Sequence, residues 1–530
     1  MLTTPAERAA PRDTVLLDGR TLDAAGVTLL ADAQARPRVD PAALTRMEAS
    51  WRAAHQLVET GRVYGRSTGV GAHRTVDVTP QDADGHDLRL LGSHAGGIGA
   101  PLPTRQVRAM LAVRVNQLLA GGSGLRPAIV LTLAEALRSR FHPQAHEYGA
   151  VGTGDLTALA QLGLTLIGRL PWLYDDHLPE AVVMVPPDTA AAAAGTEDRP
   201  EGGHRRREPP DPVPLERGDA LALLSSNALT LGQAALICHD LGRLLRASHV
   251  VSALSLLAAQ GSSEAYAAPV HAARPHLGSV HIAAEIRRLI GAPDRPGPPA
   301  GRVQDPFAFR CFPQVHGPAL EACAGLDRVL SVELNAAAEN PLISLDGPDG
   351  TPAAYHHGGF FAAPLTLQLD QLCLAVLQTA RLSAARIGAL GRADLTGLPS
   401  FLTDGTTAGS GIMILEYSAN SALAEVHAAA APASLAHAVL SQGVEEGASF
   451  ATQAARKALR VVDAYRLVLA CELVAAVRAL RLRGGPPDPA VPAGQAYAHA
   501  AAALDPDMTD RPLTGDVATA AAVLDDLAGL

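Results

Sequence analysis

Aromatic side chains are scarce in this sequence. Only 3% of its 530 residues are phenylalanine, tyrosine or tryptophan, whereas alanine is abundant. The strands of sandwiches and barrels are usually rich in aromatic and β-branched residues, while alanine is the strongest helix former. The composition therefore disfavours a β-sandwich or a β-barrel, and it predicts a mainly helical protein with a large buried core.

Basic charge and long apolar runs are missing as well. The chain has 43 Lys and Arg against 53 Asp and Glu, which gives a net charge of −10. This balance offers no basic surface for nucleic acid or for an anionic membrane, so neither is expected as a partner. No run of 18 or more apolar residues occurs, and the first residues lack the apolar stretch of a signal peptide. We therefore expect no membrane span and a cytoplasmic location.

Cysteine is also rare, and its spacing excludes two kinds of site. The five cysteines are Cys238, Cys311, Cys323, Cys373 and Cys471. They form no CxxC pair, so the pattern indicates neither a zinc site nor a disulfide framework, and it is typical of a reduced compartment. His142 and His146 are four residues apart, but Pro143 stands between them and no third ligand is evident. No metal centre is expected.

Helical periodicity is what the sequence does have. Apolar residues recur at three- and four-residue spacing, with few helix breakers, through segments 363–390, 412–431 and 450–482. Helices of this length with broad apolar faces predict an elongated, all-α bundle in which the helices bury one another. Short strands are expected only near residues 14–17 and 181–185.

The sequence patterns divide the chain into two parts. Residues 1–220 form an N-terminal part with glycine-rich loops, and residues 221–530 form the central and C-terminal bundle of long helices. Residues 186–214 combine an alanine run with arginines, acidic residues and prolines. This composition predicts a mobile surface loop within the N-terminal part.

One turn carries the strongest chemical signal. Residues 149–156 read GAVGTGDL, and an apolar segment follows them. Flanking glycines let the backbone bend until an amide nitrogen reaches the carbonyl carbon two residues back. A hydroxyl on the central residue, here Thr153, could then leave to create an exocyclic double bond. Taken alone, such a turn is more often just the start of a helix.

Seven blocks, in order along nearly the whole chain, resemble the histidine and aromatic amino acid ammonia-lyase family. The first is this turn, which reads GSVGASGDL in the family. The others are YGRSTGVG at 64–71, SHAGGIG at 93–99, VQDPFAFRC at 303–311, ENPL at 339–342, GGFF at 358–361 and EE at 445–446. The resemblance is closest to histidine ammonia-lyase. It implies the all-α fold of the ammonia-lyase and fumarase-like superfamily, in a homotetramer whose active sites each draw on three subunits.

The resemblance also implies roles for individual residues. Tyr64 matches the family's catalytic base, and Arg310 matches the arginine that binds the substrate carboxylate, for which a planar guanidinium is well suited. Gln304 would assist as a neutral donor, although a hydrogen bond at a helix end explains it equally well. His94 and Glu445 stand where histidine-specific members hold an imidazole, so the expected substrate is a small amino acid with a polar, histidine-like side chain.

Several positions depart from the family pattern, and they concern its electrophilic group. Family members make a methylidene-imidazolone ring from Ala-Ser-Gly, whereas this chain offers Gly152-Thr153-Gly154 in a loop that is one residue short. A threonine would give a more crowded and less electrophilic product. Ser225 replaces the asparagine that polarises the ring, Phe307 replaces a neighbouring tyrosine, and Phe361 lies in a more apolar wall. Asn227, two positions after Ser225, is expected to point elsewhere.

This pattern predicts an enzyme with retained binding and altered chemistry. The leading hypothesis is a lyase that removes the β-proton of a polar amino acid or analogue and expels ammonia or another leaving group. No added cofactor is expected, and Gly152-Thr153-Gly154 is expected to stay an ordinary peptide. One alternative is a lyase, cyclase or isomerase that works without the ring; another is a silent carboxylate-binding protein. The candidate catalytic residues are Tyr64, Ser225, Gln304, Arg310 and Glu445, and the candidate substrate-binding residues are His94, Phe307 and Phe361.

Overall fold

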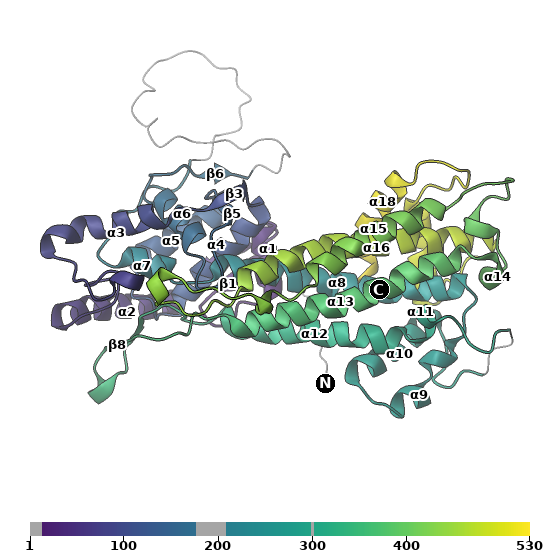
Figure 1. Ribbon diagram of the computed structural model, residues 1–530, viewed down its shortest axis with the longest axis horizontal. Coiled ribbons are helices and arrows are strands. Elements are labelled where there is room, and N and C mark those ends of the chain that lie inside the picture. Colours follow the sequence, from purple (N-terminus) through teal and green to yellow (C-terminus); the bar gives the residue numbers. More distant parts are fainter. Residues whose placement is uncertain (1–12, 176–207, 298–300) are drawn as a thin grey trace, which may run out of the picture.

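The structure is a computed structural model that describes residues 13–175, 208–297 and 301–530. It is elongated, and its longest helices run along the long axis (Figure 1). The expected all-α architecture is confirmed, since the strands in the described residues are few and short. The strand expected near 181–185 and most of the loop expected at 186–214 lie outside the described residues.

Long helices that bury one another form the body of the molecule. They are α8 (Ala228–Ala258), α12 (Phe312–Glu333), α13 (Ala363–Leu390), α15 (Met413–Ala429) and α16 (Ala451–Leu482). The periodicity predicted α13, α15 and α16, and their existence is confirmed with ends that differ by at most about two residues. Helix α16 packs against α8, α13 and α15, which places it inside the bundle.

Helix α8 is the most apolar of these helices. With the short helix before it, α7 (Asp219–Leu224), it is the one segment in the described ranges that is long and apolar enough to cross a membrane. That test uses only length and composition, and 94% of its apolar window is buried inside the protein. A helix that is apolar on all sides and enclosed by other helices is a core helix, and α8 has that place here.

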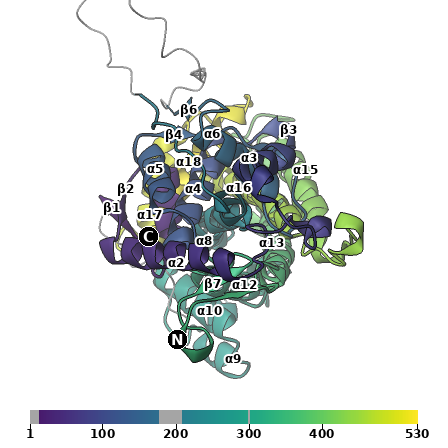
Figure 2. The same ribbon diagram turned by 90° about the vertical axis from the view of Figure 1, so that its left-hand side faces the viewer.

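The N-terminal part surrounds one end of the bundle, at the left of Figure 1 and facing the viewer in Figure 2. Its helices are α1 (Ala24–Ala31), α2 (Pro41–Thr60), α3 (Pro80–His94), α4 (Thr104–Leu119), α5 (Pro127–Arg138) and α6 (Leu156–Leu166). Its strands are β1 (Thr14–Leu17), β2 (Arg36–Val39), β3 (Ile98–Pro101), β4 (Phe141–His142), β5 (His146–Tyr148) and β6 (Leu173–Tyr174). The expected strand at 14–17 is β1, which pairs in parallel with β2 so that Thr14 lies opposite Arg36.

The two parts share one core. Helices α1 and α4 of the N-terminal part pack against α8 of the bundle. A single cluster of buried apolar side chains extends from Val15 to Leu527. A later hairpin of β7 (Leu342–Ser344) and β8 (Ala353–Tyr355) also contacts α2, although it comes from the second part of the chain. The division at residue 220 stays a prediction.

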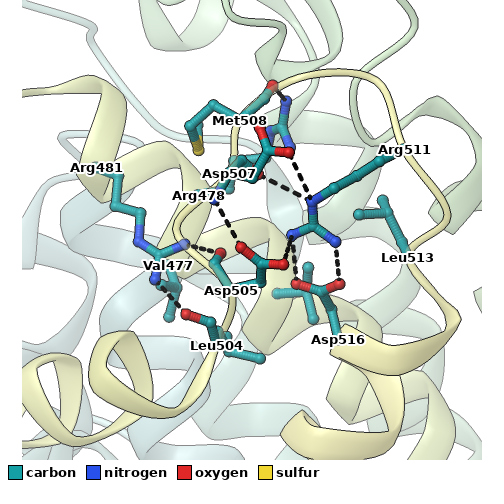
Figure 3. A pocket seen from close by; sticks show the side chains of 11 residues that line it. Val477, Arg478, Arg481, Leu504, Asp505, Asp507, Met508, Arg511, Leu513 and Asp516 are labelled. Carbon is teal, nitrogen blue, oxygen red and sulfur yellow. Dashed lines mark hydrogen bonds and ion pairs between the residues drawn. The ribbon is translucent and has the colours of Figure 1, made fainter.

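Short helices complete the opposite end of the molecule. They are α9 (Ala268–Ala272), α10 (Leu277–Ile290), α11 (Phe307–Arg310), α14 (Ala393–Thr396), α17 (Pro492–Ala503) and α18 (Thr514–Leu527). Here Arg481 donates to the carbonyls of Leu504 and Asp505, and Arg511 pairs with Asp516 at 2.6 Å (Figure 3). The cavity between these side chains is about 10 Å³, which is room for at most one water. These arginines therefore brace the end of the bundle.

Candidate active site

The glycine-rich turn before α6 has a backbone that requires glycine. Gly152 and Gly154 have φ of +88° and +114°, a region that side chains with a Cβ rarely adopt. A Cβ on Gly152 would also lie 2.2 Å from Ser449 Oγ and 2.7 Å from the backbone nitrogen of Phe450. Thr153 is half-buried between these two glycines. The local geometry therefore explains the glycines without any reference to a ring.

The start of α16 holds the carbonyl groups of this turn. The hydrogen bonds run from Ser449 Oγ to Gly152 O, from Phe450 N to Val151 O and from Gln453 Nε2 to Ala150 O, each at 2.8 Å. Ser449 is buried, so its bond is shielded from water. The carbonyl carbon that cyclisation would attack belongs to Gly152, and a donor on its oxygen polarises that carbonyl and does not block attack.

Asp155 ties the other side of the turn to the start of α8. Its backbone nitrogen donates to Ser226 O at 2.8 Å, and its carboxyl group accepts from the backbone nitrogen and the hydroxyl of Thr230, each at 2.8 Å. Thr452 of α16 adds a longer contact at 3.3 Å. Asp155 is fully buried, and burial raises the pKa of its carboxyl group to about 6. The turn is thus locked between two helix starts.

Ser225 and Asn227 hold the opposite wall of this region. The hydroxyl of Ser225 accepts a hydrogen bond from the backbone nitrogen of Asn340 at 2.9 Å. Asn227 precedes α8, and its Nδ2 donates to the carbonyl of Phe360 at 2.7 Å. Asn227 lies just before the helix and not on it, and its side chain reaches the wall that contains Phe361, a partner different from that of Ser225. Phe361 is 42% exposed.

These side chains do not fit a methylidene-imidazolone ring. The family position that supplies a polarising amide is Ser225, whose hydroxyl already accepts from Asn340. The nearby amide, Asn227, donates one of its two Nδ2 hydrogens to a backbone carbonyl. The residue that would lose its hydroxyl is Thr153, where the family has a less hindered serine.

Tyr64 lies in the loop between α2 and α3, where its hydroxyl is held by its own loop. The oxygen accepts from the backbone nitrogen of Gly71 at 2.8 Å. Burial raises the pKa of Tyr64 above its ordinary value of 10, the Gly71 N–H group opposes this, and the charge of Glu445 raises the pKa further. The charge of Arg74 lowers the pKa, but the net shift is upward, so within one chain Tyr64 is a protonated tyrosine at neutral pH and a base role needs a further cation.

The Tyr64 loop contacts two distant segments. Ala72 N donates to Ser441 Oγ at 3.1 Å, which joins the loop to the segment that contains Glu445. Tyr64 N donates to Nε2 of His356 at 3.3 Å, and the two rings meet edge to face with centroids 6.4 Å apart. The structure thus brings Tyr64, Glu445 and the wall around Phe361 to one end of the molecule. His356 and Ser449 were missed as parts of this region.

His94 makes only local contacts in the described part of the chain. It is the last residue of α3, and its Nδ1 lies 2.9 Å from Leu90 O and 3.0 Å from Ser93 Oγ. His94 and Glu445 are both half-buried. Their pairing around a substrate ring stays a prediction.

Gln304, Phe307 and Arg310 lie at the other end. Helix α11 and the loop between α2 and α3 are at opposite ends of the long axis (Figure 1). The Nε of Arg310 donates to the backbone oxygen of Asp305 at 3.0 Å, and its guanidinium lies 3.9 Å from the centroid of the Phe307 ring. Gln304 is exposed, and Phe307 is 65% exposed. One chain therefore does not bring Arg310 to Tyr64.

Comparisons with known proteins identify the family of this chain. A family model for aromatic amino acid lyases matches residues 22–504. Histidine ammonia-lyase from Anaeromyxobacter dehalogenans is 34% identical over 520 residues, which are 97% of this chain and 99% of that protein. Family members use a methylidene-imidazolone group made from their own chain.

Solved structures show the same fold. Histidine ammonia-lyase from Trypanosoma cruzi superposes with a TM-score of 0.85 at 26% identity and covers 97% of this chain and 93% of that one. The ergothioneine-degrading ergothionase from Treponema denticola shares the fold with a TM-score of 0.85 at 23% identity, over 98% of this chain and 100% of that one. The chain therefore belongs to the aromatic amino acid lyase family and is a carbon–nitrogen lyase.

Proposed function

We propose that this lyase acts on an α-amino acid or close analogue with a polar, histidine-like side chain. It removes a β-proton and expels ammonia or another leaving group, with formation of a carbon–carbon double bond. The observation that carries the proposal is the docking of the Tyr64 loop on the segment of Ser441 and Glu445. This docking places the candidate base near the carboxylate that would receive a polar substrate ring.

The active site is completed by other copies of the chain in a homotetramer, so that each site draws on three subunits. In the described residues only Nε of Arg310 makes a hydrogen bond, so its terminal nitrogens are available for a substrate carboxylate. The side chain of the neighbouring Phe307 is 65% exposed, that of Leu367 on α13 is 60% exposed and that of Tyr417 on α15 is 68% exposed. Large apolar side chains along the bundle support contacts between copies. A partner's guanidinium near Tyr64 would also lower the pKa of Tyr64 towards that of a base.

The reaction proceeds without a methylidene-imidazolone ring. This part of the proposal is supported by Thr153 and by Ser225, which puts a hydroxyl that already accepts from Asn340 where the family has the polarising amide. The same contacts favour the second candidate, a lyase, cyclase or isomerase whose substrate has a leaving group that departs without activation. Retention of Tyr64 argues against a silent binding protein. A cytoplasmic location fits the cysteines, which are all free.

Intact-mass spectrometry tests the ring. We expect a mass equal to that of the sequence, because threonine is hindered and the supporting polar groups are engaged elsewhere. A mass lower by the waters that cyclisation and dehydration release would contradict this expectation. The substrate class is tested separately by following the ultraviolet absorbance of unsaturated product from L-histidine and from L-phenylalanine. Product from phenylalanine alone would contradict the polar side chain and leave the family assignment unchanged.

A further inference from the structure

Helix α11 is too short to satisfy its own backbone. It has four residues, and the last carbonyls of any α-helix lack partners within the helix. Two buried side chains from other elements supply these partners. The hydroxyl of Tyr266 donates to Phe309 O at 2.6 Å, and Nη1 of Arg386 donates to Ala308 O at 3.1 Å. Tyr266 and Arg386 are both fully buried.

Arg386 is itself held rigidly by Glu472. Nε and Nη2 of Arg386 donate to the two carboxylate oxygens of Glu472 at 2.6 and 2.8 Å, and both side chains are fully buried. Ser255 and Ser383 donate to the same two oxygens at 2.7 and 2.5 Å. Bidentate geometry with every oxygen engaged fixes both position and orientation. The remaining guanidinium nitrogen of Arg386, Nη1, is the one that donates to the carbonyl of Ala308.

The fixed backbone of α11 restrains Arg310, the last residue of that helix. Its Nε donates to the carbonyl of Asp305, whose carboxylate accepts from Ser262 N at 2.6 Å and from Arg302 Nε at 3.1 Å. The Phe307 ring lies against the guanidinium on the same helix. Both contacts of Arg310 therefore depend on groups whose own positions are set by buried bonds.

We propose that Tyr266 and Arg386 are positioning residues that preorganise Arg310 to bind the substrate carboxylate. The inference rests on the proposed function, because it takes Arg310 as the carboxylate-binding residue. A binding group held in place before the ligand arrives loses less freedom on binding. Removal of either bond to α11 then weakens binding of a carboxylate even though neither side chain contacts the ligand.

Tyr266→Phe is the sharpest test, since it removes one hydroxyl and keeps the ring. The control is Tyr174→Phe, because Tyr174 is a partly buried tyrosine in β6, in the N-terminal part of the molecule. Hydrogen exchange of the peptide covering residues 303–311 should quicken about 3- to 10-fold in Tyr266→Phe and stay unchanged in the control, as expected for one lost hydrogen bond. Unchanged exchange in Tyr266→Phe would overturn the anchoring of α11.

Calorimetry with L-histidine and L-histidinamide, which lacks the carboxylate, connects this anchor to Arg310. Tyr266→Phe should weaken binding of L-histidine about 3- to 10-fold and leave L-histidinamide unchanged. Equal weakening of both ligands would overturn the positioning role. In the Arg310→Met background the effect of Tyr266→Phe on L-histidine should vanish, and persistence of the full effect would also overturn it.

Arg386→Lys provides a second variant, because lysine can still pair with Glu472 but lacks the fork that reaches Ala308. It should speed exchange at residues 303–311 at least as much as Tyr266→Phe does, and slower or unchanged exchange would count against the proposal. If Arg310→Met itself leaves the preference for L-histidine over L-histidinamide unchanged, the proposed function fails at Arg310. The exchange measurements still decide whether the anchor exists.

Discussion

The two ends of this molecule hold their functional groups in opposite ways. At the end of the molecule that contains the glycine-rich turn, groups of the turn are hydrogen-bonded to the first residues of two helices, and Gly152, Gly154 and Asp155 are all buried. At the end of the molecule that contains α11, the hydrogen bonds from Tyr266 and Arg386 to the helix are also buried. The side chains of Arg310 and Phe307 on that helix are nevertheless partly or largely exposed. We call the first the closed end, because its turn is enclosed by helices of the same chain, and the second the open end, because its side chains are accessible to a partner.

This difference matches where the chain departs from its family. Thr153 and Ser225 lie at the closed end, and their neighbours use the available polar groups to stabilise the fold. At the open end Arg310 is retained, and only Phe307 departs from the family pattern. The residues proposed for activation and for carboxylate binding therefore lie in separate parts of the structure. A family member can change one of them without dismantling the other.

The largest expected effect is at the closed end, where Tyr64→Phe removes the candidate base. Turnover should fall by about 10²-fold or more, the usual loss when a general base is removed. The fold should persist, because the ring remains and only the bond from Gly71 is lost. Steady-state kinetics at saturating substrate measure this. Tyr355→Phe, a partly exposed tyrosine of β8, is the control, and unchanged turnover in Tyr64→Phe would remove Tyr64 from the mechanism.

At the open end, Arg310→Met should act on binding more than on turnover. The substitution deletes a charge-assisted clamp, for which a loss of about 10- to 100-fold in affinity is expected. Titration calorimetry with L-histidine provides the measurement. Arg392→Met is a matched control, since this exposed arginine pairs only with the nearby Asp394. A fall in turnover at unchanged affinity would show that the two ends are not separate in function.

Local patterns predicted much of this arrangement. The period of apolar residues found α13, α15 and α16, and glycine spacing found both the turn and the loop of Tyr64. The contact of Ser449 with Gly152 could not be found in this way, because 297 residues separate them. The partner of Asn227 could not be found either, because its side-chain direction depends on where α8 begins.

Roles that depend on burial were also beyond the sequence. Tyr266 and Glu472 carry no local signal that they face α11 and Arg386, since those neighbours are set by the packing of the bundle. Nor does the sequence signal that His356 accepts from the backbone of Tyr64, 292 residues away. Periodicity reports which face of a helix is buried, but it does not report which polar groups meet there.

Two buried groups, His249 in the bundle and Asp155 at the closed end, should change the stability of the fold in opposite directions as the pH falls. In the bundle, burial lowers the pKa of His249 to about 3, so the folded protein binds fewer protons than the unfolded chain between about pH 3 and 6.5. Stability supplied by neutral His249 is complete above pH 6.5 and is lost as the pH falls. Asp155 has the opposite sign, because its raised pKa makes the folded protein bind more protons between about pH 4 and 6.

Urea unfolding at pH 7 and pH 5 measures this difference. From pH 7 to pH 5 the free energy of unfolding should fall by about 2 kcal/mol through His249 and rise by about 1 kcal/mol through Asp155. His249→Gln should therefore lose less stability than the unaltered protein over this range, and Asp155→Asn should lose more. If both variants show the slope of the unaltered protein, the assigned burial of these two groups is wrong.

The smallest effect is expected for specificity at the closed end. Glu445 and His94 are both half-buried, so a mismatch with an apolar ring costs less than it would in a dry pocket, about 1 kcal/mol or a factor of about 5. The aromatic wall at Phe360 and Phe361 acts in the other direction, but an imidazole can also pack against it. We expect L-histidine to bind more tightly than L-phenylalanine, and Glu445→Gln to reduce that preference about 5-fold while leaving phenylalanine unchanged. Glu446→Gln, one residue further along and exposed, is the matched control in calorimetric titrations. Tighter binding of phenylalanine, or an equal effect of both substitutions, would show that the closed end selects its ligand by the apolar wall and not by the carboxylate.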